Sequence, residues 1–355
     1  MKKTGIITYH DSDNYGSVLQ AYALCKYINQ YKPCEIIDFR KPEVKKAYRV
    51  FKPMTSKFNI ITDVYRAFSL KKYIHRKRGF EKFRQAELTL SPYTVHTKEE
   101  LSRHINRYDT IIVGSDQVWN YDIFDFDTAY MLDFPEYVGK RVSYAASCGP
   151  ITKTVQSIMP YKPLIDKFDV ITVRDEETKK IIESVCQKDV SIVLDPVFLL
   201  SKSEWVELAK KSSLKKKDKY IFCYFPGGVR KDIEQYSENL AKNMGSKRIF
   251  VESEWRNIFI KGKKFYDCNV YDFIKLINDA ECVVTTSFHA VAFCIILGKD
   301  FRVAYGNGVF DTRISTLLKM SGNTNNLIFN EIEINNELCL GEEIERSKEV
   351  LRRLA

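Results

Sequence analysis

Residues 280–299, AECVVTTSFHAVAFCIILGK, decide the fold that we expect for this chain. They open with a short apolar run rich in β-branched residues, 282–286, which is typical of a strand buried on both faces. A polar break follows at Ser287, and a second apolar run then continues to Gly298, where a helix would end. Strand, tight turn and helix therefore meet at His289. In open α/β sheets ligands bind at this edge, where exposed amides favour anions. We predict that His289 faces a cleft; a histidine packed near a helix start is the alternative.

Length and composition indicate a globular protein of more than one domain. The 355 residues exceed what one hydrophobic core usually serves, and 45% hydrophobic with 29% charged residues is not typical of a disordered chain. No apolar run approaches the roughly 20 residues that cross a bilayer, and the start, MKKTGIITYH, does not resemble a signal peptide. The nine cysteines form no CxxC pair. We expect buried free thiols in a reducing cytoplasm, with no disulfide framework and no metal site.

Strand-like and helix-like patterns alternate along the chain. Strand 3–9, a helix over 18–31 and strand 34–39 begin a βαβ unit, and the alternation continues to a strand at 190–194. The pattern restarts with strand 220–225. We predict two Rossmann-like βα domains that face a cleft between their strand ends. The predicted domains are 1–205, which holds the acceptor side and a basic helix at 69–86, and 206–355, which holds the donor side and His289; the C-terminal helix is expected to pack back on the first domain.

The net charge of +10 is concentrated in residues 69–84, SLKKYIHRKRGFEKFR, where aromatic and aliphatic residues alternate with seven Lys and Arg. Such a helix suits an anionic membrane face or a diphosphate-linked acceptor. Nucleic acid also suits its charge, but no recognised nucleic-acid module accompanies it, so we expect no nucleic-acid partner. A solvated helix face is the remaining alternative.

Seven motifs occur in order along the chain: NYGxxLQA at 14–21, GSDQVWN at 114–120, SYAAS at 143–147, VRDE at 173–176, LDP at 194–196, TSFH at 286–289 and RIxxLL at 313–318. This ordered set resembles the polysaccharide pyruvyl transferase family from about residue 4 to 320. The resemblance implies an α/β fold like that of GT-B glycosyltransferases. It also implies transfer of a pyruvyl group from phosphoenolpyruvate, with no further cofactor, onto a hexose as a ketal. The acceptor would be linked to a lipid diphosphate or to a growing surface polysaccharide.

The resemblance also implies the residues that bind the donor. Family members bind phosphoenolpyruvate with arginines and a histidine near the interdomain cleft, and these roles fall on Arg174 and His289, with Arg313 as a further candidate. The chain departs from the family at two positions. Some members carry Arg where this chain has Ser287, and Gly is frequent where it has Ala290.

The chemistry of such a donor fits these residue types. A carboxylate and a phosphate need fixed positive charge, which arginine forks match bidentately. Arg174 follows a strand, and its alternative role is an ion pair with the acidic turn at 175–177. Arg313 stands at a helix start, and its alternative role is an ion pair with Asp311.

Ketal formation also needs a proton donor and a base. We assign proton donation to His289 and the general base to Asp116, for which helix capping is the alternative. Trp119 is a candidate for stacking on a sugar ring or for a buried core indole. Asn14 and Gly16 would present helix amides to a diphosphate or hydroxyl, or form a structural turn. The remaining substrate-binding candidates come from the matched motifs: Ser287, Gln20, Ser115, Gln117 and Asn120.

These patterns together predict a cytoplasmic pyruvyl transferase that is either free or peripheral on the inner face of the membrane. No HExxH, GxSxG or Walker element occurs. Two rival hypotheses remain. One is a nucleotide-sugar-dependent GT-B glycosyltransferase. The other is a non-catalytic, membrane-associated assembly subunit, for which the missing Arg at position 287 is the argument.

Overall fold

The computed structural model describes residues 3–48, 57–121, 123, 126–149, 158–215, 218–251, 261–306, 311–329 and 340–354, with the backbone alone for 57–69. The chain divides by its internal contacts into two units. Unit 1 comprises Met1–Tyr48, Arg84–Leu200 and Cys339–Ala355, and unit 2 comprises Arg49–Phe83 and Ser201–Leu338. Each unit is described by itself.

Unit 1 is built on a seven-stranded parallel sheet in the order β3-β2-β1-β4-β5-β6-β7. Its strands are β1 Lys3–Ile7, β2 Cys34–Phe39, β3 Leu90–Val95, β4 Tyr108–Val113, β5 Lys140–Ala146, β6 Val170–Val173 and β7 Val190–Ile192. Its helices are α1 Tyr15–Ile28, α2 Pro42–Ala47, α4 Lys98–Ser102, α6 Lys162–Ile165, α7 Glu176–Val185 and α13 Leu340–Leu354, with short 3₁₀ turns at η1 Ile105–Arg107, η2 Thr128–Met131, η3 Met159–Tyr161 and η4 Pro196–Leu199. Strand order reverses between β1 and β4, which is the switch point where ligands bind in doubly wound sheets.

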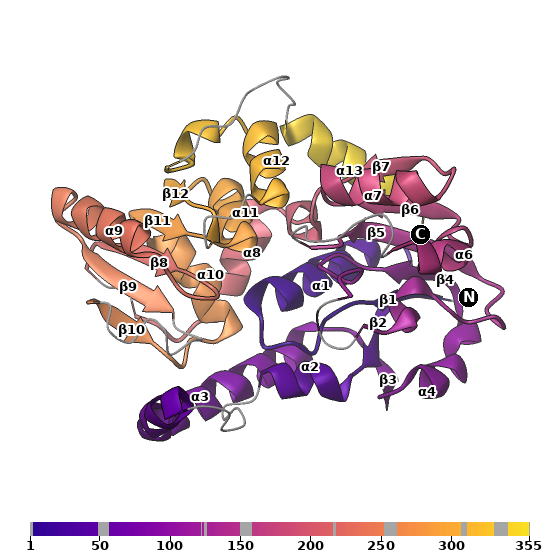
Figure 1. Ribbon diagram of the computed structural model, residues 1–355, viewed down its shortest axis with the longest axis horizontal. Helices are drawn as coiled ribbons and strands as arrows, with labels where there is room; N and C mark the ends of the chain where they lie inside the picture. Colours follow the sequence, from indigo (N-terminus) through magenta and orange to yellow (C-terminus); the bar gives the residue numbers. More distant parts are fainter. Residues whose placement is uncertain are drawn as a thin grey trace. The chain divides into compact units, whose positions relative to one another are not determined.

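Helix α1 lies in the core of unit 1 beside this switch point (Figure 1). Every residue of α1 except Lys26 is buried, and Lys26 is also its one charged residue. The strand residues Ile6, Ile7 and Val113 are fully buried as well, because helices cover both faces of a parallel sheet. The rigid packing of α1 fixes the start of that helix relative to the ends of β1 and β4.

Unit 2 carries a five-stranded parallel sheet in the order β10-β9-β8-β11-β12. Its strands are β8 Tyr220–Tyr224, β9 Lys247–Val251, β10 Lys263–Phe265, β11 Cys282–Thr285 and β12 Phe301–Val303. Its helices are α8 Lys202–Ala209, α9 Lys231–Asn243, α10 Val270–Asp279, α11 Phe288–Leu297 and α12 Thr312–Met320, with η7 Thr324–Asn326; the long helix α3, Lys57–Glu87, belongs to unit 2 up to Phe83. The order again reverses in the middle of the sheet, between β8 and β11.

The strand, turn and helix predicted at 280–299 are confirmed as β11 and α11. All four residues of β11 are buried, between β8 on one side and β12 on the other. Ser287 caps α11 by accepting a hydrogen bond from the Ala290 amide at 3.4 Å. Gly298 ends the helix at φ 67°, a left-handed conformation that glycine adopts without strain. His289 therefore stands at the switch point of the second sheet.

The structure differs from the predicted domain boundaries at the basic helix. The domain predicted at 1–205 includes the basic helix 69–86, whereas α3 belongs to unit 2 up to Phe83. The reason is aromatic packing: Phe83 lies 5.2 Å from Tyr271 and Tyr73 lies 6.0 Å from Tyr266 between ring centroids. The burial of these rings against unit 2 places the helix in that unit, although the helix is closer in sequence to unit 1.

Helix α13 packs on unit 1. The Ser347 hydroxyl accepts a hydrogen bond from the Leu194 amide at 3.0 Å, and the Arg346 guanidinium donates to the Ile192 carbonyl at 2.7 Å. The eight cysteines within the described residues are buried free thiols. The same residues contain no helix long and apolar enough to span a membrane, and no group of three or more His, Cys, Asp or Glu able to hold a metal ion.

Candidate functional site

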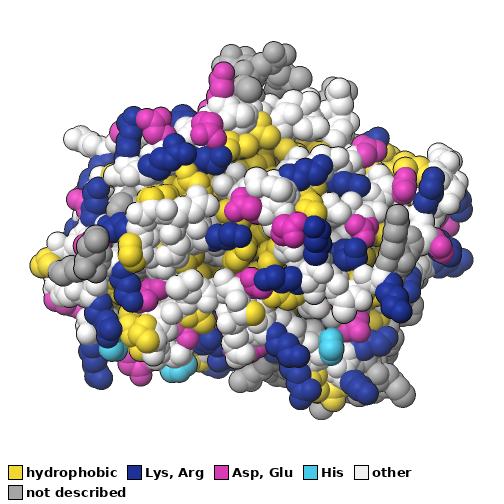
Figure 2. Space-filling view, turned by 180° about the vertical axis from the view of Figure 1, so that it is seen from behind, with side chains coloured by type: hydrophobic (Ala, Val, Ile, Leu, Met, Phe, Trp, Pro, Cys, Tyr) yellow, Lys and Arg dark blue, Asp and Glu magenta, His cyan; other side chains and the backbone are white. Residues whose placement is uncertain are grey.

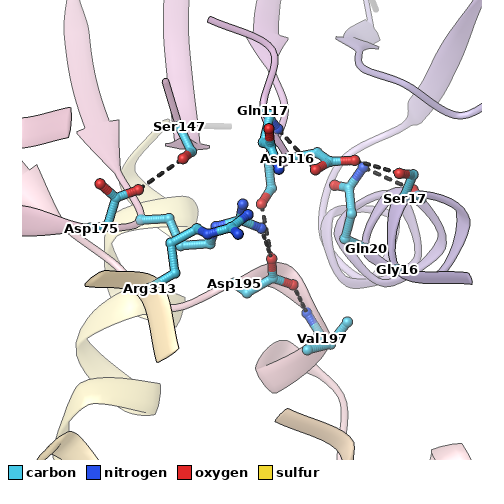
Figure 3. A network of polar contacts seen from close by, with 12 residues as sticks. Gly16, Ser17, Gln20, Asp116, Gln117, Ser147, Asp175, Asp195, Val197 and Arg313 are labelled. Carbon is cyan, nitrogen blue, oxygen red and sulfur yellow. Dashed lines mark hydrogen bonds and ion pairs between the residues drawn. The ribbon is translucent and has the colours of Figure 1, made fainter. Parts of the chain in front are cut away.

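Polar side chains gather at the carboxyl edge of the seven-stranded sheet, directly after four neighbouring strands (Figure 3). The residues that follow β4, β5, β6 and β7 in this way are Ser115 and Asp116, Ser147, Arg174 and Asp175, and Asp195. Because the carboxyl ends of parallel strands share one edge, residues separated by up to 80 positions form hydrogen bonds here. These four strand ends of unit 1 therefore bring together residues from distant parts of the chain.

Asp116 lies at the switch point, where its carboxylate reaches across from β4 to α1. The Ser17 hydroxyl donates a hydrogen bond to the Asp116 carboxylate, and the other carboxylate oxygen accepts from the Gln117 amide at 2.9 Å. The Asp116 backbone adopts φ 79°, a left-handed conformation that is costly for a residue other than glycine. A backbone hydrogen bond holds this conformation, because the Ser147 amide donates to the Asp116 carbonyl at 3.1 Å. No helix of the described chain begins at Asp116, so the capping alternative does not apply.

Ser17 was missed by sequence reasoning. It lies in α1 and is 5% exposed, and a serine early in a helix is more typical of local capping than of a contact 99 residues away. Its only sequence signal was its place inside the NYGxxLQA motif. The hydrogen bond from Ser17 holds the half-buried Asp116 carboxylate in place at the switch point. A carboxylate held in this way can act as a general base.

The side chains of the segment after Asp116, residues 117–120, contact one another and Gly149. The Asn120 side-chain amide donates to the Gln117 side-chain oxygen at 2.8 Å. Gly149 lies against both at φ 81°, and a Cβ there would meet Asn120 Nδ2 at 2.5 Å and Gln117 Oε1 at 2.6 Å. The φ of 81° favours glycine, and a Cβ here would displace the ends of these two predicted substrate-binding side chains.

The predicted stacking of Trp119 on a sugar is wrong. Its indole is 0% exposed, donates from Nε1 to the Tyr130 carbonyl at 3.0 Å, and packs edge to face on Phe168. The buried core indole is the alternative that the structure supports. The indole of Trp119 is therefore part of the core of unit 1 and is not accessible to a sugar ring.

Arg174 is held by a buried ion pair. Its Nη1 donates to the Asp195 carboxylate at 2.7 Å, with side-chain exposures of 1% for Arg174 and 0% for Asp195. The Ser115 hydroxyl donates to the same carboxylate oxygen at 3.1 Å. This hydrogen bond fixes the side chain of Ser115, which we predicted to bind substrate. The other carboxylate oxygen of Asp195 caps η4 by accepting a hydrogen bond from the Val197 amide at 3.1 Å. The LDP motif therefore supplies the anion that orients Arg174, and donor binding by Arg174 remains a prediction.

Ser147 and Asp175 form a second buried pair that sequence reasoning did not single out. The Ser147 hydroxyl donates to Asp175 Oδ2 at 2.8 Å, while Oδ1 caps α7 by accepting from the Thr178 amide at 2.8 Å. The Gly149 amide in turn donates to the Ser147 hydroxyl at 3.1 Å. Both residues lie in motifs quoted above, but their partnership depends on strands β5 and β6 being neighbours.

The start of α1 is satisfied by its own cap. Asn14 Oδ1 accepts from the Gly16 amide at 2.9 Å and from the Ser17 amide at 3.4 Å, so the structural turn is the observed state of Asn14 and Gly16. Gln20 is fully buried and donates to the Thr8 hydroxyl and the Ser17 carbonyl, each at 2.9 Å. Binding of a diphosphate by the amides therefore stays a prediction, and Gln20 acts in this structure as a support for α1.

A charged cluster surrounds the loop that precedes α1. His10 Nε2 lies 2.9 Å from Asp38 Oδ1, and Arg40 Nε donates to the same oxygen at 2.7 Å. Burial raises the pKa of Asp38, but hydrogen bonds from His10, Arg40 and Thr94 outweigh it and hold the pKa well below the ordinary value. Burial raises the pKa of the neighbouring Asp11 in spite of nearby arginines. This cluster fixes loop 10–13.

In unit 2, His289 occupies the first turn of α11 and is half-buried, with its ring edge to face with Phe288 at 5.2 Å between centroids. Ser287 is occupied as the helix cap. Thr286, at the end of β11, is 9% exposed, and no hydrogen-bond partner of its hydroxyl is recorded within the described residues. Thr286 is the first residue of the TSFH motif. These residues give α11 a polar start beside the imidazole.

Arg313 pairs with Asp311, as the alternative interpretation held. Its Nε and Nη2 donate to the two carboxylate oxygens at 3.0 and 2.7 Å, and its amide donates to Oδ1 at 3.0 Å. Burial raises the pKa of Asp311, but the Arg313 charge and hydrogen bonds outweigh it, so the net pKa lies below the ordinary value. A common pocket for Arg313, His289 and Arg174 remains a prediction.

Several solved structures share this fold. The chain aligns with UDP-GlcNAc 2-epimerase of Methanocaldococcus jannaschii in complex with UDP-GlcNAc and UDP at 11% identity and a TM-score of 0.54, covering 99% of this chain and 100% of that chain. It aligns with a putative UDP-N-acetylglucosamine 2-epimerase of Listeria monocytogenes at 10% identity and a TM-score of 0.53, covering 100% and 92%. MnaA of S. aureus with UDP aligns at 12% identity and a TM-score of 0.51, covering 100% and 92%. These likenesses show a GT-B-like α/β fold.

A search of curated proteins finds no significant match. The family model described as polysaccharide pyruvyl transferase matches residues 14–306. This span includes both switch points, from Asn14 at the start of α1 to His289 at the start of α11. The match covers most of the chain and contains six of the seven ordered motifs, whereas RIxxLL at 313–318 lies beyond it. It also agrees with the GT-B-like fold. The chain belongs to the polysaccharide pyruvyl transferase family.

Proposed function

We propose that this protein transfers the pyruvyl group of phosphoenolpyruvate onto a hexose of a lipid-diphosphate-linked precursor of a surface polysaccharide. The observation that carries the proposal is the family match across residues 14–306, which includes both switch-point motifs. Phosphoenolpyruvate is the donor substrate, and no further cofactor is needed. Such an acceptor would bring the protein to the cytoplasmic face of a membrane.

The reaction balances without an oxidant or reductant. The methylene carbon of phosphoenolpyruvate gains a proton and becomes the methyl group. Two sugar hydroxyls then form C–O bonds to the central carbon, and the bond from that carbon to the phosphate oxygen breaks. One hydroxyl hydrogen is accounted for on the methyl group and the other on the released phosphate.

The roles follow from charge and position. We assign to His289 the proton delivered to carbon or to the leaving phosphate oxygen, because an imidazole exchanges protons near neutrality. Asp116 accepts the hydroxyl proton, supported by its half-buried carboxylate and its contact with Ser17. Arg174 and Arg313 match the donor's carboxylate and phosphate, each already oriented by one aspartate.

The test is to incubate the purified protein with phosphoenolpyruvate and a panel of lipid-diphosphate hexoses, and to measure phosphate release and the mass of the acceptor. We expect phosphate release together with an acceptor that gains one pyruvyl group. His289→Ala should abolish both while circular dichroism stays unchanged, whereas His96→Ala, which alters an exposed histidine of unit 1, should be active. No product from a broad panel, or full activity of His289→Ala, would contradict the proposal.

A nucleotide-sugar-dependent transferase is the second candidate, because fold neighbours of this chain were solved with UDP bound. Thermal protection separates the two. Phosphoenolpyruvate should raise the melting temperature of the parent, and UDP or other nucleoside diphosphates should not. Protection by nucleoside diphosphates alone would favour the second candidate, and protection by neither would favour a non-catalytic subunit.

A further inference from the structure

Helix α3 presents a straight row of basic side chains to solvent. Lys71, His75, Arg78 and Lys82 follow the spacing i, i+4, i+7 and i+11, which places them on one face of a helix over about 16 Å. All four are exposed, and we call them the basic row. Within the described residues, no ion pair is recorded for Lys71, Arg78 or Lys82. Lys71, Arg78 and Lys82 therefore present three basic side chains to solvent.

The opposite face of α3 anchors the helix. Tyr73, Phe80 and Phe83 are buried, and Tyr73 and Phe83 pack on tyrosines of unit 2. The aromatic residues that alternate with the cations in sequence thus point inward and do not belong to the basic row. Within residues 70–87, the exposed side of the helix adds the apolar side chain of Ile74, at 37% exposure. The outer face of α3 is suited to a charged plane, and too polar to insert deeply into a lipid.

We propose that the basic row docks this protein on an anionic membrane surface. The argument is charge complementarity: cations arranged in a line on a rigidly anchored helix can approach a planar array of lipid phosphates together. Each Lys or Arg near such a surface contributes about a fivefold gain in binding. Lys72, which lies over the Tyr266 ring at 5.8 Å, adds a further cation beside the row. Binding depends on the row alone and needs neither donor nor acceptor.

A second basic feature of unit 2 provides the matched control. A hollow of about 450 Å³ between the end of α9 and the starts of β9 and β10 is lined by exposed lysines that include Lys242, Lys261 and Lys263. Glu238 also lines it and pairs with Lys242 at 3.1 Å, so the hollow is partly neutralised. Figure 2 shows Lys and Arg spread among Asp and Glu over the face that it draws, so net charge alone does not select a docking surface.

The test uses the full chain and vesicles of phosphatidylcholine containing phosphatidylglycerol, with pure phosphatidylcholine vesicles as reference. Co-sedimentation is measured for the parent, for Lys71→Gln/Arg78→Gln/Lys82→Gln and for Lys242→Gln/Lys261→Gln/Lys263→Gln, which remove equal charge. We expect about a hundredfold weaker binding of the row variant to anionic vesicles, near-parental binding of the control variant, and release of the parent at about 1 M salt.

Three results would overturn the proposal: no binding of the parent to anionic vesicles, equal losses in both variants, or binding of the parent to double-stranded DNA in preference to vesicles. Circular dichroism of both variants checks that they fold. Because the assay contains no phosphoenolpyruvate, its failure would leave the proposed reaction untouched, and a failed reaction would leave the docking result standing.

Discussion

Replacing Asp195 with alanine should destabilise unit 1 by about 3–5 kcal/mol, because it leaves the Arg174 charge inside the protein without its carboxylate. The side chains are 1% and 0% exposed and meet at 2.7 Å, so water does not replace the lost partner. The Ser115 hydroxyl also loses its acceptor. An exposed pair of the same unit is the matched control: Lys162–Asp166 lies at 2.9 Å with both side chains 42% exposed, so Asp166→Ala should cost about 1 kcal/mol or less.

The assay must report on unit 1 alone, since a chain of two units need not unfold in one step. Hydrogen exchange measured by mass spectrometry on peptides from β4 to β7 meets this need. A loss of about 3–5 kcal/mol there corresponds to about a hundredfold to several-thousandfold faster exchange. Peptides from β8 to β12 should be unchanged.

Two outcomes would refute the reasoning. One is a similar small change in Asp195→Ala and Asp166→Ala, which would mean that the buried pair contributes no more than a surface pair. The other concerns the double variant Arg174→Met/Asp195→Leu. Removing both charges should restore most of the stability that Asp195→Ala loses, because apolar groups of similar size replace a buried pair at little cost. Continued instability of the double variant would show that packing, and not charge, was lost.

Three further predictions concern unit 1. Ser17→Ala should lower kcat about 10- to 100-fold with KM for the donor little changed, because a hydrogen bond to the charged Asp116 is lost; a change in KM alone would argue against the role of Asp116 as base. Gly149→Ala should cost about 1–3 kcal/mol in the hydrogen exchange of peptides from β4 to β7, because the residue adopts φ 81° and its Cβ would displace the Asn120 and Gln117 side-chain ends; unchanged exchange would contradict this strain. Since the folded pKa of Asp38 is lowered, its contribution is present above an unfolded pKa of about 4 and is lost as pH falls below it; Asp38→Asn should flatten the acid end of the stability curve, and an unchanged acid limb would count against this.

Much of the fold could be predicted because local patterns and tertiary packing agree. The run 282–286, the polar break and Gly298 describe a buried strand, a cap and a helix end, and each is set by neighbours in sequence. Ordered motifs likewise identified the family, since they need no knowledge of which strands pair.

The sequence alone determined the strand, turn and helix at 280–299, the alternation of strands and helices in both halves of the chain, and the family. It did not set every boundary: the helix predicted at 18–31 is Tyr15–Ile28 in the structure. Tertiary structure decided the partners. Three features depend on contacts between segments far apart in the chain: Ser17 donates to Asp116, Arg174 pairs with Asp195, and the aromatic side chains of α3 turn inward. The same burial removed Trp119 from the surface. The physical reason is that strand order and helix packing set which side chains meet, whereas periodicity in one segment reports only which face is apolar.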